Sequence, residues 1–119
     1  MADSILLDKS KDLAVEIVNL CKQLRAERKE YVLSNQLLRS GTSVGANIHE
    51  SKYAQSKADF ISKMQIALKE CYESEYWLEL LNRTNYLEHN KYKQLNSLCT
   101  SIRRMLISSI NTLKNNKNS

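Results

Sequence analysis

Apolar residues recur every three or four positions along most of this chain, which is the spacing of one face of an α-helix. Two such segments cover about residues 6–27 and 31–53. A third starts near Ser56 and repeats apolar or small residues at positions 60, 64, 67, 71, 74, 78 and 81, a heptad spacing typical of helices packed at a small angle. A fourth starts near Asn90, after a polar break at residues 82–85. The pattern therefore predicts four amphipathic helices.

The arrangement of these helices follows from their apolar stripes, which can leave water only by packing against one another. Because short connections favour antiparallel neighbours, we expect an all-α fold, an antiparallel up-down-up-down four-helix bundle. A single domain should span residues 1–119, with a frayed tail from about residue 114. Proline is absent and glycine occurs only twice, so little interrupts long helices. Ser56 and Asp59 form an S-x-x-D pattern that predicts a cap on the third helix.

Both glycines, Gly41 and Gly45, lie in a run of small residues within the second helical segment, at positions 40–47. Each glycine costs a helix about 1 kcal/mol relative to alanine. The close approach of another backbone would offset this cost, and we expect such a contact here. A phosphate-binding loop is the alternative interpretation. It is weakened by the absence of a G-K-[ST] sequence and of a preceding strand.

Cysteine and histidine usage argues against redox, metal and catalytic chemistry. Cys21, Cys71 and Cys99 lie far apart on apolar stripes, which predicts buried thiols in the reducing cytoplasm. His49 begins half of an H-E-x-x-H zinc motif, but position 53 is a tyrosine, and His89 lies in a linker far from it. With only two histidines, the chain has few candidates for a general base. We therefore expect a cytoplasmic protein that is not an enzyme, with no metal, no cofactor, no signal peptide and no membrane span.

Positive charge is concentrated in the last quarter of the chain. Residues 1–88 carry 12 basic and 13 acidic side chains, whereas residues 89–119 carry 6 basic and no acidic ones. The outer face of the fourth helix has four cations, at Lys93, Arg103, Arg104 and Lys114, with small polar residues between them. Such a face suits the phosphates of RNA or DNA. Alternatively, it docks an acidic protein partner or pairs with the acidic run of a neighbouring helix or subunit, at Glu70, Glu73, Glu75 and Glu79.

The third helix carries a second apolar patch outside its heptad stripe, made by Ile66, Trp77 and Leu80. One bundle core does not easily cover two sides of a helix, so the patch predicts an interface between copies of the chain, anchored by Trp77. Two alternatives remain open. The helix could be wrapped on both sides within one subunit, or Trp77 could lie flat on the surface.

A motif in the second helical segment follows the pattern Q-L-x-R-x-x-x-S-I-x-x-N-I-x-E-G, with matches at Gln36, Leu37, Arg39, Ser43, Asn47, Ile48 and Glu50. Together with positions 35–40, 42–48, 50 and 60–73, it makes residues 13–106 resemble a known family. The family is that of the bacterial 23S rRNA-intervening sequence proteins, whose relatives include the accessory proteins of diversity-generating retroelements. The chain departs from the family pattern with Val44 for isoleucine, His49 at a position where a small residue is common, and Ser51 for the final glycine.

The resemblance implies a four-helix protomer that assembles into a ring, commonly a homopentamer. In the retroelement relatives, it implies a positively charged assembly that binds nucleic acid and a reverse transcriptase. The family is not known for a catalytic residue, so Arg39, Asn47 and Glu50 carry over as motif positions for packing and interface structure.

Overall fold

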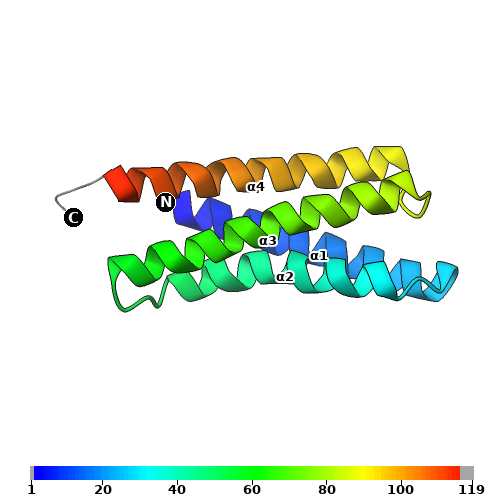
Figure 1. Ribbon diagram of the computed structural model, residues 1–119, viewed down its shortest axis with the longest axis horizontal. Coiled ribbons are helices and arrows are strands. Elements are labelled where there is room, and N and C mark those ends of the chain that lie inside the picture. The colour runs from blue at the N-terminus through cyan, green and yellow to red at the C-terminus, as the bar shows by residue number, and fades with distance from the viewer. Residues whose placement is uncertain (1, 116–119) are drawn as a thin grey trace.

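The four predicted helices are present in the computed structural model, which describes residues 2–115 and the side chains of residues 5–115. They are α1 (Ala2–Arg28), α2 (Val32–Ser51), α3 (Lys57–Arg83) and α4 (His89–Asn115). Among the described residues there is no strand. The helices lie lengthwise beside one another in a rod of 53 × 22 × 20 Å (Figure 1). α4 starts at His89, a residue that the sequence analysis had placed in a linker. It continues through Asn115, so the tail that was predicted to fray from residue 114 is helical as far as it is described. Residues 116–119 lie outside the described part.

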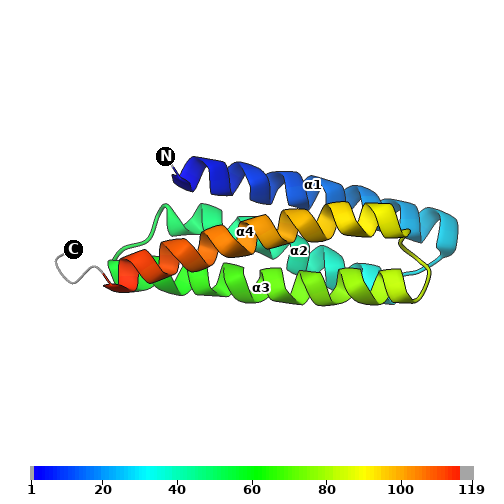
Figure 2. The ribbon, with the colours of Figure 1, turned by 90° about the horizontal axis from the view of Figure 1, so that it is seen from above.

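The helices alternate in direction along the chain, as the colour sequence of the ribbon shows in two perpendicular views (Figures 1 and 2). α1 and α3 each lie beside both α2 and α4, and within residues 2–115 the Cα atoms of diagonally opposite helices stay more than 8 Å apart. Gly41 lies against Ile17 and Gly45 against Ser10, so residue numbers rise along α2 as they fall along α1. This arrangement is the predicted antiparallel up-down-up-down bundle.

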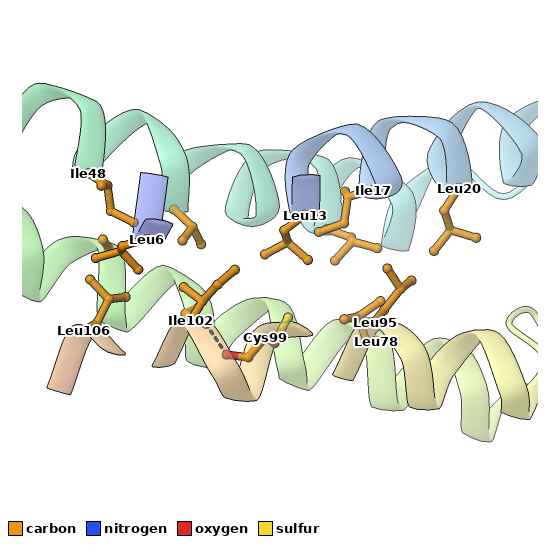
Figure 3. Close-up of a cluster of buried hydrophobic side chains, with 14 of the residues drawn as sticks. Leu6, Leu13, Ile17, Leu20, Ile48, Leu78, Leu95, Cys99, Ile102 and Leu106 are labelled. Carbon is orange, nitrogen blue, oxygen red and sulfur yellow. Dashed lines mark hydrogen bonds between the residues drawn. The ribbon is translucent and has the colours of Figure 1, made fainter. Parts of the chain in front are cut away.

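The core lies along the axis of the rod, between all four helices (Figure 3). Every helix contributes its predicted apolar stripe. On α3 the heptad positions from Met64 onward are buried: Met64, Ala67, Cys71, Ser74, Leu78 and Leu81. Phe60, the first position of that stripe, is only half-buried at the end of the bundle. The periodicity of the sequence thus predicted the buried side of each helix.

Side chains near the helix starts accept hydrogen bonds from amides that have no partner within the helix. The Ser56 hydroxyl accepts a bond of 3.0 Å from the Asp59 amide, which confirms the predicted cap of α3. The Glu30 carboxylate does the same for α2, accepting from the amides of Leu33 and Ser34 at 3.1 and 2.8 Å. A negative charge there also interacts favourably with the helix dipole.

α1 and α3 are each followed closely by a residue in the left-handed region, directly after Arg28 in α1 and after the cap residue Thr84 in α3. Lys29 has a φ of 56° and Asn85 a φ of 68°. The following amide then reaches back to the last turn, from Glu30 to the Leu24 carbonyl and from Tyr86 to the Leu81 carbonyl. These bonds satisfy helix-end carbonyls and turn the chain toward the next helix without glycine or proline.

The two glycines lie in the middle of α2, where the backbone of α1 comes close. Neither has a positive φ, so glycine is not needed for its conformational freedom. A Cβ on Gly41 would lie nearer than 3.0 Å to Ile17 Cδ1, and one on Gly45 would lie 3.1 Å from Ser10 Oγ. The predicted approach of another backbone is confirmed at Gly45, where the added Cβ would lie 3.5 Å from the Ser10 carbonyl oxygen; at Gly41 the neighbour is the Ile17 side chain. The alternative of a phosphate-binding loop is wrong, because these amides belong to a continuous helix.

All three cysteines are free and buried, as predicted. The Cys21 thiol donates to the Ser34 carbonyl at 3.3 Å, and the Cys71 thiol to the Cys99 carbonyl at 3.4 Å. Burial raises the pKa of Cys21 to about 11, which keeps this thiol protonated. None of the described helices is long and apolar enough to cross a bilayer.

Candidate functional site

The outer face of α4 presents three exposed cations. Lys93, Arg104 and Lys114 all face solvent, and none of them belongs to an ion pair found among residues 5–115. Their sequence spacings of eleven and ten residues place them about 16 and 15 Å apart along the helix axis. Ser97, Ser108 and Asn111 are exposed on the same helix. α4 carries no carboxylate, so the charge of this face is not neutralised from within its own helix.

Arg103, the fourth predicted cation, turns toward α3. Its Nε donates to Glu75 Oε2 at 3.0 Å and its Nη2 to Glu75 Oε1 at 3.4 Å, and 26% of the Arg103 side chain is exposed. The hydrogen bonds to Glu75 raise the pKa of Arg103. Lys91, outside the predicted set, is likewise paired with Glu16 of α1. The structure therefore separates Arg103 from the three free cations and pairs it with the acidic run of α3, which is the partner named in the alternative interpretation.

A second charged cluster joins α2 to α3. Arg39 Nη1 donates to Glu70 Oε2 at 2.8 Å, and its Nη2 donates to Glu73. The indole of Trp77 donates to the same Glu73 carboxylate at 3.0 Å. These bonds, first from Trp77 and then from Arg39, lower the pKa of Glu73. Because Glu70 is only 7% exposed, Arg39 supplies the positive charge that a buried carboxylate requires.

The other motif positions also make contacts within the protomer. Ile48 is part of the core. The Asn47 amide donates to the Ser43 carbonyl at 2.9 Å, and Glu50 pairs with Lys63 of α3 at 3.3 Å. Gln36 is exposed on the outer side of α2. The motif thus connects α2 to α3 at two points, Arg39 and Glu50, as expected of residues that support packing.

The apolar patch of α3 belongs to a longer stripe with alternating spacings of four and three residues. Its members are Ile66, Glu70, Glu73, Trp77 and Leu80. Trp77 is half-buried and packs against the core, which corresponds to one of the alternatives left open for it. Ile66 is 41% exposed and Leu80 is half-buried. The stripe is therefore partly covered by its own protomer and partly open.

Two features of these surfaces were not anticipated from the sequence. The first is the cluster in which Arg39 pairs with Glu70 and Glu73. Of the contacts in this cluster, the hydrogen bond between Trp77 and Glu73 could have been expected from their spacing of four residues. The second is the exposure of Tyr72 and Tyr76, at 50% and 60%. Their positions outside the heptad stripe would have predicted it.

Comparisons with known proteins point to one family. The model of the 23S rRNA-intervening sequence protein family matches residues 2–108. A crystal structure from Bacteroides thetaiotaomicron, described as a protein with unknown function from the S23 ribosomal protein family, is 56% identical in sequence. Its TM-score is 0.91, and the match covers 93% of this chain and 99% of that one. A search of curated proteins found no match.

Proposed function

Since this chain belongs to the 23S rRNA-intervening sequence protein family, we propose that it is a non-enzymatic protein that self-associates and binds nucleic acid through α4. The observation that carries the proposal is the set of free cations on a helix without carboxylates. The free, buried cysteines are consistent with a cytoplasmic location.

The charge of α4 that remains available to phosphate comes from fewer cations than its composition suggests. Of its five cations, Lys91 and Arg103 are neutralised by other helices, and Lys93, Arg104 and Lys114 are not. Exposed serine and asparagine side chains between them offer hydrogen bonds to phosphate oxygens. Contacts of this kind position a nucleic-acid backbone without reading its sequence. We therefore expect binding with little sequence preference.

Self-association is proposed for the stripe of α3 that contains Ile66, Trp77 and Leu80. Its apolar members remain partly open to water, and the Arg39 cluster holds Glu73 and Trp77 in fixed positions. A preorganised aromatic beside partly open apolar side chains is a favourable anchor for another copy. The family resemblance favours a homopentamer, in which five α4 faces would act together and raise the effective affinity.

Nucleic-acid binding is tested by fluorescence anisotropy with labelled RNA and DNA pools at several salt concentrations. If three cations each neutralise one phosphate, log affinity should fall with log salt with a slope of about −2.7 on duplex DNA. The triple variant Lys93→Gln, Arg104→Gln, Lys114→Gln should lose most of this slope.

A matched control has the same change in net charge on α1 and its C-terminal end, at the exposed Lys11, Lys22 and Lys29, each replaced by glutamine. It should bind like the parent. Binding that ignores salt, or an equal loss in both triple variants, would contradict the assignment to α4.

Self-association is tested by light scattering of the parent and of Ile66→Ser, which changes the most exposed apolar member of the stripe. We expect a smaller assembly for this variant. Val15→Ser on α1 removes an apolar side chain of 59% exposure elsewhere and should leave the assembly unchanged. A parent that is monomeric at micromolar concentration would contradict the proposal.

A second candidate is an adaptor whose α4 face docks an acidic protein partner or a neighbouring subunit. Family analogy separately names a reverse transcriptase as a protein partner. The adaptor candidate is favoured by the pairing of Lys91 and Arg103 with carboxylates of neighbouring helices. For this candidate, Arg104→Glu should abolish capture of the acidic partner. The parent would then show no salt-dependent affinity for either nucleic-acid pool.

A further inference from the structure

Two tyrosines on α3 have no role in the core or in the surfaces described above. Tyr72 and Tyr76 are 50% and 60% exposed. They lie four residues apart on one side of the helix, about 6 Å from each other along its axis. A large aromatic ring left open to water on a helix surface commonly marks a contact site.

Both rings are held in place by neighbours that leave part of each ring free. The Arg103 guanidinium carbon lies 5.6 Å from the centroid of the Tyr72 ring. Arg103 is itself fixed by its two hydrogen bonds to Glu75. Tyr76 makes an edge contact with Trp77, with ring centroids 5.0 Å apart and an interplanar angle of 77°. The two rings therefore form a preorganised surface and need little ordering on binding.

Two exposed cations that belong to no ion pair found among residues 5–115 lie in this part of α3 and α4. Lys69 is exposed one turn before Tyr72, and Arg104 is exposed on α4, one residue after the Arg103 that lies over the Tyr72 ring. The nearby carboxylates are paired, Glu75 with Arg103 at 3.0 Å and Glu79 with Arg83 at 3.4 Å. An aromatic surface bordered by unpaired cations complements a ligand that has flat rings and an anionic backbone.

We propose that Tyr72 and Tyr76 stack with bases of single-stranded nucleic acid, whose phosphates lie along Lys69 and Arg104. This inference rests on the proposed function and specifies the form of nucleic acid that is bound. In a duplex the base faces are covered by their neighbours, and successive bases on a strand are about 3.4 Å apart. Rings carried on residues about 6 Å apart along the helix axis would instead take bases that are separated from each other, as a single strand permits.

The test compares a labelled twelve-nucleotide oligo(dT) with a twelve-base-pair duplex of mixed sequence, both followed by anisotropy. The parent should bind the single strand more tightly. Tyr72→Leu with Tyr76→Leu keeps apolar area but removes the rings, and affinity for oligo(dT) should fall roughly 5- to 150-fold for each ring that stacks. The salt slope should stay unchanged because the cations remain.

The matched control is Tyr31→Leu with Tyr53→Leu, which removes two exposed tyrosines at the ends of α2. It should bind oligo(dT) like the parent. If the parent binds neither probe, the proposed function itself fails. If the parent binds both probes and the Tyr72 and Tyr76 variant is unaffected, only the stacking inference fails. A smaller assembly of that variant by light scattering would show that the tyrosines contact another copy, and this too would overturn the inference.

Discussion

Replacement of Gly41 by alanine tests whether close contact between α1 and α2 explains glycine in the middle of a helix. The new Cβ would lie nearer than 3.0 Å to Ile17 Cδ1, and 3.1 and 3.3 Å from Ile17 Cγ2 and Cγ1. Carbon atoms pack best at about 3.5–4.0 Å, so Ile17 would have to move. It is fully buried, and its displacement disturbs the core around it.

The expected magnitude is the difference between two opposing effects. Overpacking of a buried site costs about 1–3 kcal/mol. Alanine in place of glycine within a helix returns about 1 kcal/mol. We therefore expect Gly41→Ala to lower the free energy of unfolding by roughly 0–2 kcal/mol.

A second substitution identifies the atom responsible. Ile17→Val removes Cδ1, the closest atom, and by itself should cost about 1 kcal/mol. In the double variant the methyl group introduced by Gly41→Ala takes part of the vacated space. The double variant should therefore be more stable than the sum of the single effects predicts, by at least about 1 kcal/mol.

The assay is urea unfolding followed by circular dichroism, at one protein concentration because self-association would add to stability. Gly45→Ala is the matched control. Its nearest carbon contact would be 3.5 Å away and its nearest atom is the Ser10 hydroxyl oxygen at 3.1 Å, so its stability should change by no more than about 1 kcal/mol. A Gly41→Ala protein as stable as the parent, with strictly additive effects, would refute the close-contact explanation.

Two further predictions concern the ionisation of Glu73 and the burial of the three thiols. The pKa of Glu73 is lower in the folded protein than its ordinary value of 4.5, so ionised Glu73 stabilises the fold at pH values above 4.5. This contribution is lost as the pH falls through the pKa of Glu73 in the folded protein. Trp77→Phe removes the hydrogen bond that lowers the pKa of Glu73 most, so the urea midpoint of this variant should fall less between pH 6 and pH 3 than that of the parent. An equal fall in both proteins would contradict this role of Trp77. Cys21, Cys71 and Cys99 are buried, so Ellman's reagent at pH 8 should label them only as fast as the protein unfolds. Immediate labelling of any native thiol would contradict this.

Much of the fold could be predicted from local sequence patterns because the physical constraints are local. Three- and four-residue spacing identified the buried side of every helix, and Ser56 identified the start of α3. Gly41 and Gly45 indicated a close helix contact without specifying which helix would supply it. The start of α4 was predicted near Asn90 and lies at His89, so only the assignment of His89 to the linker was wrong, by one residue.

The candidate sites were less predictable because they depend on pairs of helices. Lys93, Arg104 and Lys114 were assigned to an outer face from the sequence, and they are exposed. Arg103 was grouped with them because it lies outside the apolar stripe of the same helix. Its long side chain reaches Glu75 only because α3 lies beside that flank of α4.

The sequence by itself determined four amphipathic helices, their alternating order and the acid-free character of the last one, because hydrophobic periodicity and composition act within a segment. Only the tertiary structure decided which charges are neutralised and which rings stay open. Ion pairs such as Arg39–Glu70 depend on the rotation and register of one helix against its neighbour. That geometry results from packing the whole core, and no single segment encodes it.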